Sequence, residues 1–267
     1  MRSSPLVVLA MFAMTGCVTT RIVERPAVDK VHKVAIVSVY SNYQIGHVGG
    51  SSGPMGEAQG LASMFGGKKD KNEAADRVGF GGTTLVEFAE RELRDQLAKV
   101  SGWEVIEPKD FVNQSYFKEF VAKGDQKTGA EKMTLSETST RHPQLAKFPI
   151  LVKNAAKEAE LKELAAKIGA DAVVVLSLNI AYDTSSGIGS TGTALAVVNP
   201  NLLIVNNQGQ LTVHEIGDYK FRSKTTVAMV GGSIIFNKKS EGMFEEAIGT
   251  GLAYYPTRIN KDLEETK

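Results

Sequence analysis

The residues that could perform chemistry in this chain are few and far apart. Cys17 is the single cysteine among 267 residues, so it cannot form a disulfide within the chain and must serve another purpose. The histidines have none of the spacings of a metal site, and no second cysteine exists to complete a zinc site. The sequence therefore predicts no metal and no cofactor, and it directs attention to the surroundings of Cys17. The four histidines are His32, His47, His142 and His214.

Cys17 follows a segment with the layout of a secretory signal. A positive charge precedes an apolar run at residues 6–14. This run is too short for a helix that spans a bilayer, which needs about 20 apolar residues. Small residues, Thr15 and Gly16, stand directly before the cysteine, as a cleaved export signal requires. We therefore expect residues 1–16 to be removed from the exported protein.

The four residues at the predicted cleavage site, Met14-Thr15-Gly16-Cys17, resemble the lipobox of bacterial lipoproteins, with Met14 where leucine is commoner. In that family the signal is cut between the positions of Gly16 and Cys17, and the cysteine is acylated on its thiol and its new amino group. The resemblance implies that acylated Cys17 binds membrane lipid. Val18, rather than aspartate, follows the cysteine, which implies the outer membrane, facing the periplasm, in a Gram-negative cell. A plain cleaved signal with an incidental cysteine is the alternative.

The composition favours a globular domain and argues against nucleic-acid binding. Hydrophobic residues make up 42% of the chain, which is enough for a core. Lys and Arg number 31 against 30 Asp and Glu, a net charge of +1, so there is no basic excess for nucleic acid. After the signal we expect a lipidated tether over residues 17–31 and a single domain over 32–267.

Residues 34–180 have the order strand, helix, strand, helix, strand, which is typical of an α/β layer fold. The strands are expected at 34–40, 103–106 and 172–178, where short apolar runs are rich in β-branched residues.

Two amphipathic helices separate these strands. The first is expected to start at Thr84, because Thr84 and Glu87 have the spacing of a capping box. The second covers residues 155–168, where Gly169 supplies a left-handed terminator.

The last third of the chain predicts antiparallel strands and a final helix. The strands are expected at 202–205, 211–216 and 221–230, with turns at 206–209 and 217–218. The helix starts near Glu241, and Pro256 should kink or split it, because proline lacks an amide hydrogen. The predicted fold class is therefore α/β, with a mixed sheet (β-α-β-α-β, then antiparallel strands) and a C-terminal helix.

Three stretches, at about 43–82, 109–150 and 183–201, are predicted to be long, mobile loops, the second with short helical pieces around residues 111–121. The first is rich in glycine, and a loop of such length inside a compact domain is either functional or disordered. We expect it to contact the partner, since function concentrates on loops that a rigid scaffold holds. Simple disorder is the alternative.

Other candidate chemistry has a structural explanation. Ser177 and Ser233 lack the glycines of a nucleophile elbow. The glycine-rich stretch at 79–84 precedes a helix, where an anion could bind, but it lacks the lysine of a P-loop. Asp171 lies in a turn before a buried strand. The sequence predicts no catalytic residue, and we expect the protein not to be an enzyme.

One pattern is similar to a known group of proteins. It comprises the strand 34–37, the strand 103–107 and the turn Gly169-Ala170-Asp171-Ala172 into an apolar strand, followed by a hairpin at 206–210 and a final helix containing 247–251. This pattern resembles envelope lipoproteins that include the curli-secretion channel protein CsgG, the penicillin-binding-protein activator LpoB and the related amino-terminal domain of TolB. The resemblance implies a TolB-N/CsgG-like, non-enzymatic domain that binds other envelope proteins or assembles into a ring.

Two functions follow from this resemblance. The first is a lipid-anchored accessory or binding module that acts on an unidentified envelope protein. The second is a homo-oligomeric, CsgG-like secretion channel, which would place two β-hairpins of each subunit in the outer membrane. The candidate hairpins are residues 183–199 and 221–236. A membrane strand needs about 9–11 residues with an alternating lipid face, and the alternation is poor in the first segment and middling in the second. The sequence therefore favours the accessory module.

Overall fold

The computed structural model describes most of the chain between residues 20 and 264. The described residues are 20–23, 25–42, 45–48, 82–125, 139–148, 155–188, 191–216, 220–230, 233–234 and 237–264. The predicted signal peptide, with Gly16 and Cys17, lies outside the described residues, and so do the predicted turn at 217–218 and most of the stretch 43–82.

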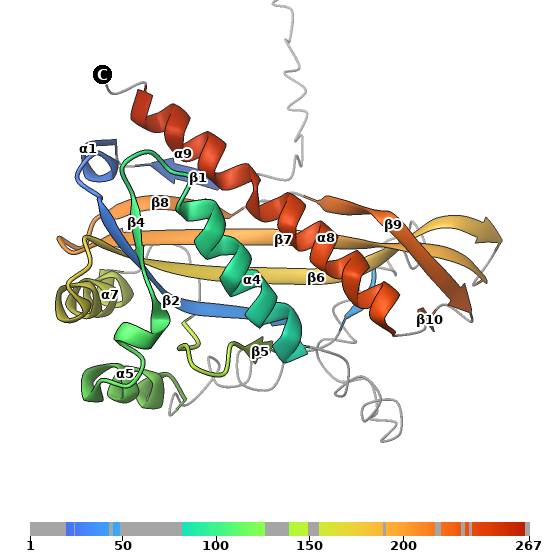
Figure 1. Ribbon diagram of the computed structural model, residues 1–267, viewed down its shortest axis with the longest axis horizontal. Coiled ribbons are helices and arrows are strands. Elements are labelled where there is room, and N and C mark those ends of the chain that lie inside the picture. Colours follow the sequence, from blue (N-terminus) through green and yellow to red (C-terminus); the bar gives the residue numbers. More distant parts are fainter. Residues whose placement is uncertain are drawn as a thin grey trace, which may run out of the picture.

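A mixed β-sheet forms the centre of the domain, with the strand order β1-β8-β7-β6-β2-β4 (Figure 1). The strand β2 (Lys33–Asn42) lies parallel to β4 (Glu104–Ile106) and to β6 (Ala172–Ile188). The strands β7 (Thr191–Asn206) and β8 (Leu211–Ile216) follow in antiparallel pairing. The predicted α/β class with a mixed sheet is confirmed.

Three helices cross one face of this sheet: α4 (Gly82–Leu97), α8 (Lys238–Leu252) and α9 (Tyr254–Glu264) (Figure 1). The predicted split of the C-terminal helix is confirmed, because α9 begins two residues after α8 ends and has Pro256 in its first turn. A proline there removes no helical hydrogen bond. The predicted start of α4 is wrong by two residues. Thr84 lies inside the first turn, which the burial of Leu85 and Val86 holds in place.

Two further helices lie together near the end of the sheet where β6 begins. They are α5 (Ser115–Asp125) and α7 (Ala155–Ile168), and the second has the predicted bounds (Figure 1). Gly169 adopts a φ of 77°, as a left-handed terminator requires. The Asp171 carboxylate then accepts the backbone amides of His32 and Lys33, at 2.9 and 2.8 Å, and so joins the starts of β2 and β6. Asp171 is therefore a structural turn residue, as predicted.

The predicted loop at 183–201 is wrong. β6 and β7 continue through it as one hairpin with strands of 17 and 16 residues. Its glycines allow two backbones to approach closely: a Cβ atom on Gly187 would lie 2.3 Å from the Thr191 carbonyl oxygen, and one on Gly192 would lie 2.0 Å from that of Ser186. These residues are glycine because of cross-strand contact, a requirement that composition alone does not distinguish from flexibility.

The predicted tether at 17–31 is wrong for most of its length. The strand β1 (Thr20–Val23) pairs with β8, and the helix α1 (Arg25–Val28) follows. The side chains of Ala27, Val28 and Val31 are at most 2% exposed. Each of these elements has four residues, too few for a hydrophobic period, so pairing and burial in the folded domain must stabilise them.

The predicted loop at 109–150 is also largely structured where the structure describes it. A 3₁₀ turn (Pro108–Asp110) leads to α5, which confirms the expected helical piece, and β5 (Ser139–Arg141) pairs with β2. Phe111, Phe117 and Phe148 are buried and connect this region to the core. Within the stretch 43–82, the described strand β3 (Gly46–His47) pairs with β6.

Candidate functional site

The two segments that the sequence analysis proposes as membrane hairpins lie next to each other at the end of the sheet that extends past α8. Here β9 (Phe221–Val230) pairs with β7 between Gly192 and Val198, and β10 (Ser233–Ile234) pairs with β9. These strands extend past α8 on the right of Figure 1. We refer to residues 183–188, 191–198, 221–230 and 233–234 as the distal hairpins. The segments 183–199 and 221–236 thus lie side by side in one sheet.

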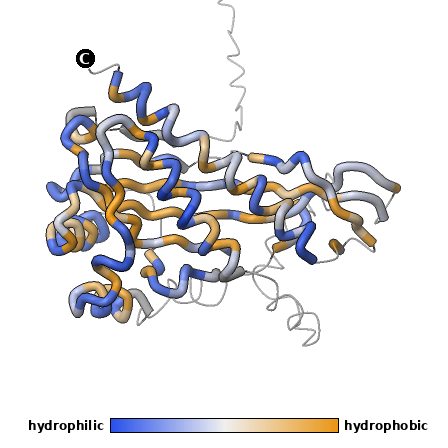
Figure 2. The backbone as a smooth tube through the Cα atoms, in the orientation of Figure 1, coloured by the Kyte–Doolittle hydropathy of each residue, from blue (hydrophilic) through white to orange (hydrophobic). Residues whose placement is uncertain are grey.

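The charged residues of the distal hairpins lie only near the body of the domain. No charged residue occurs between Thr184 and Val198, or from Thr225 to Ile234. Charges resume together where Asp183 of β6 forms an ion pair with Arg222 of β9, with 3.0 Å between Oδ2 and Nη2. Beyond this pair and Lys224, the described strands consist of small polar and apolar residues, and this end of the tube is mostly pale and orange in Figure 2.

Exposed apolar side chains gather at this same end. Among the described residues, the exposed large hydrophobic side chains are Ile188 (92%), Val230 (59%) and Val48 (43%). Ile188 ends β6, Val230 ends β9, and the Val48 amide donates to the carbonyl of Tyr182 in β6. Apolar side chains that cluster in water mark a surface for contact with a partner or a membrane. We therefore take the distal hairpins as the candidate functional site.

A bend in β9 fixes the distal hairpins to the body of the domain. The ladder with β7 is interrupted between Arg222 and Thr226, and the Ser223 hydroxyl fills the gap by accepting the Ala196 amide at 2.9 Å. The Glu246 carboxylate of α8 accepts the amides of Lys224 and Thr225, each at 3.0 Å. One side chain of the helix thus satisfies both backbone amides that the bend leaves without a strand partner.

Acid should loosen this bend. Hydrogen bonds from Thr225, above all from its backbone amide, hold the pKa of Glu246 below its ordinary value of 4.5. A lowered carboxyl pKa stabilises the fold fully above pH 4.5, and this contribution is lost as the pH falls through the lowered value. Hydrogen exchange of the Lys224 and Thr225 amides should therefore accelerate, relative to the core, below pH 4.5.

Glu246→Gln is the informative variant, because an uncharged amide cannot respond to acid in this range. In this variant, exchange of the Lys224 and Thr225 amides should no longer accelerate below pH 4.5. The neighbouring Glu245→Gln variant should behave as the natural protein does. Equal acid sensitivity in both variants would show that another group controls the bend.

Strand β1, the first element that the structure describes, lies at an edge of the sheet. Thr20 pairs with Ile216 at the start of β1, and Cys17 precedes Thr20 by three residues. At about 3.3–3.6 Å per extended residue, the Cys17 Cα cannot lie more than about 11 Å from that of Thr20. In the described part of the chain, no helix is both long and apolar enough to cross a membrane.

The histidines and serines considered from the sequence lie apart from each other. His142 is buried, and burial lowers its pKa, although the negative charge of Glu87 acts in the opposite direction. His47 Nε2 lies 2.6 Å from the Thr184 hydroxyl oxygen, at the base of the distal hairpins. Ser177 is half-buried inside β6. Within the residues that the structure describes, no group of three or more His, Cys, Asp or Glu side chains could hold a metal ion.

Sequence reasoning missed Ser223, Glu246 and the exposed apolar residues of this site. The two charge-free runs, in a chain with 23% charged residues, were the available signal. No protein-family model matches the chain, and no curated protein matches it either.

Proposed function

We propose that this protein is a lipid-anchored, non-enzymatic binding lipoprotein of the bacterial cell envelope, which acts through contacts with another envelope protein. The observation that carries the proposal is that strand β1 starts at Thr20, three residues after the cysteine of the lipobox-like sequence. A domain so close to an acylated residue rests at the membrane surface. Cys17, acylated after cleavage behind Gly16, is the attachment site in this proposal.

The short connection changes how the protein would reach its partner. A long tether would let the domain search through the periplasm, whereas β1 keeps the domain within about 11 Å of its anchor. The sheet from β1 to β4 is six strands wide, which is about 24 Å at about 4.8 Å per strand. Along the strands the domain is longer, since the 17 residues of β6 span about 56 Å at about 3.3 Å per residue, so the domain reaches its partner through its own length and not through a tether.

We propose the distal hairpins as the contact surface. Their exposed Ile188 and Val230 are the support for this choice. The described start of the stretch 43–82, which the sequence proposes as the partner contact, adds Val48 at the same end. Both candidate contact regions thus meet beside β6.

For the fold we propose membership of the CsgG, LpoB and TolB amino-terminal-domain group. The support is the parallel pairing of β2 with β4 and β6, the Gly169–Asp171 turn into β6, and the final helices packed on the sheet. The resemblance to this group implies a non-enzymatic domain.

The secretion channel is the second candidate, and one observation favours it. The two proposed membrane hairpins are adjacent, as two hairpins of one barrel wall would be. Their charge-free part is short, however. β6 has five residues beyond Asp183, and β9 has six beyond Lys224. A membrane strand needs about 9–11 residues, so the binding module is the better supported function.

Light scattering of the full-length protein, extracted in mild detergent, tests this choice. A monomer or dimer supports the binding module, and a defined ring of many subunits would overturn it in favour of the channel. Mass spectrometry of the same preparation should find acyl groups on an N-terminal Cys17. An unmodified N-terminus would contradict lipid anchoring.

A further inference from the structure

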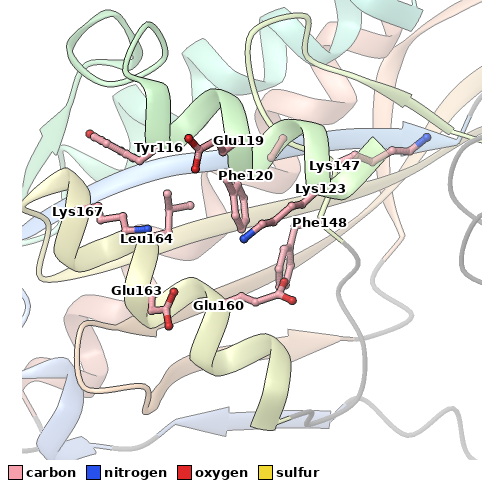
Figure 3. Close-up of a pocket in the computed structure, with 11 residues that line it drawn as sticks. Tyr116, Glu119, Phe120, Lys123, Lys147, Phe148, Glu160, Glu163, Leu164 and Lys167 are labelled. Carbon is pink, nitrogen blue, oxygen red and sulfur yellow. The ribbon is translucent and has the colours of Figure 1, made fainter. Parts of the chain in front are cut away.

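A hollow of about 310 Å³ lies between α5, α7 and the segment 146–148, at the opposite end of the sheet from the distal hairpins (Figures 1 and 3). Its apolar lining comes from Tyr116 and Phe120, which are half-buried, and from Ala146, Phe148 and Leu164, which are at most 3% exposed. The rings of Phe120 and Phe148 are nearly parallel, at 15°, with 5.9 Å between their centroids. Phe148 is 2% exposed and its amide donates to the Ser38 hydroxyl, so the core fixes this surface in place.

Charged side chains of both signs surround these rings. The helix α5 contributes Glu119 and Lys123, and α7 contributes Glu163 and Lys167, each an i, i+4 pair. Figure 3 shows Lys123 extending beside the rings of Phe120 and Phe148. Glu160 also lines the hollow and pairs with Lys157, with 3.7 Å between Oε2 and Nζ.

The four i, i+4 residues keep their charges available. A glutamate followed four residues later by a lysine ordinarily forms an ion pair on a helix surface. In the part of the chain that the structure describes, neither Glu119 with Lys123 nor Glu163 with Lys167 does so. Two ammonium groups and two carboxylates thus border one apolar surface without neutralising each other.

This combination selects one class of ligand. The lining has three lysines and three glutamates, so it offers no net charge to a simple anion or cation. Its volume is at the low end for a binding pocket, which suits one or two side chains rather than a large cofactor. A peptide whose apolar side chain stands between an acidic and a basic residue would match the rings, the lysines and the glutamates together.

We propose that this hollow binds such a peptide segment of the partner protein, with an aromatic or aliphatic side chain against the half-buried ring of Phe120. Its acidic residue meets Lys123 or Lys167, and its basic residue meets Glu119 or Glu163. This inference rests on the proposed function and adds a second, chemically selective contact to the one at the distal hairpins.

The test uses the full-length lipoprotein in detergent and three blocked tripeptides as probes. N-acetylated, C-amidated Glu-Phe-Lys should bind at least about tenfold more tightly than blocked Gln-Phe-Gln or Glu-Ala-Lys, as measured by titration calorimetry or ligand-observed NMR. Equal binding of all three, or binding of none, would overturn the proposal.

Variants then locate the binding. Lys123→Glu should weaken binding of Glu-Phe-Lys about tenfold, while Lys118→Glu, an exposed change on α5 outside the hollow, should leave it unchanged. Equal weakening by both variants would contradict the assignment to this hollow. Detergent-phase partition and crosslinking to envelope proteins in the same preparations test the proposed function separately, because neither depends on binding of the tripeptide.

Discussion

Exporting residues 18–267 behind a conventional cleaved signal, so that Cys17 is absent, should release the protein from membranes. Several acyl chains give firm attachment, because each buried methylene contributes about 0.8 kcal/mol. Without the chains, the partition between detergent and water should shift toward water by several orders of magnitude. Detergent phase separation, with immunoblotting of both phases, measures this shift.

The fold should be unaffected by this change, because β1 begins at Thr20. The urea midpoint of the released protein should equal that of the lipoprotein when both are measured in the same micellar detergent. Retention of the released protein in the detergent phase would contradict the prediction. It would mean that the distal hairpins themselves enter the membrane, and it would favour the channel.

Periodicity explains why so much of the body of the fold could be predicted from sequence. The helix at 155–168 and the strands at 211–216 and 221–230 have the bounds that their apolar spacing predicts. The helix buries one stripe and the strand 221–230 buries one face, so in these two elements the side-chain pattern and the backbone period agree. The split at Pro256 follows in the same way from a missing amide hydrogen.

Elements that depend on distant parts of the chain could not be predicted. β1 has four residues and exists because β8, nearly two hundred residues later, supplies its hydrogen bonds. The hairpin of β6 and β7 looked like a glycine-rich loop, since Gly187 and Gly192 show their role only when the two strands face each other. Tertiary contact decides both cases, and no local window of sequence contains it.

The candidate sites show the same limit. The hollow takes its residues from α5, from the segment 146–148 and from α7, and the first two lie inside the stretch 109–150 that was predicted to be a loop with short helical pieces. The pairs Glu119–Lys123 and Glu163–Lys167 have the ordinary spacing of solvent-exposed helix pairs. Only their position beside Phe120 and Phe148 gives them a possible role in recognition.

Replacing Arg258 with methionine should destabilise the domain by about 3 kcal/mol. Arg258 of α9 donates to the Glu215 carboxylate of β8 at 2.9 Å, and the Glu215 side chain is 1% exposed. Removing one partner of a buried ion pair weakens the compensation of the charge that remains, and breaking such a pair costs about 3–5 kcal/mol. We choose the lower figure because the Arg258 side chain is 30% exposed. Urea unfolding followed by circular dichroism measures the difference.

Arg222→Met is the matched control, because it breaks the exposed pair with Asp183 and should cost at most about 1 kcal/mol. Glu215→Met combined with Arg258→Met should recover most of the lost stability, since the buried carboxylate is then removed together with its arginine. Equal losses for Arg258→Met and Arg222→Met would mean that solvent reaches Glu215 and that the pair is not a buried one.

The position of this ion pair gives it a consequence for anchoring. Glu215 of β8 is the register partner of Arg21 in β1. The same Glu215 accepts a hydrogen bond from Arg258 of α9, so β8 connects β1 to α9. Any pull from an acylated Cys17 passes through β1 into β8 and from there through Arg258 into α9. In Arg258→Met, exchange of the β1 amides should therefore accelerate more than that of the β2 amides. A uniform change would place the weakened contact outside the path that connects the anchor to the domain.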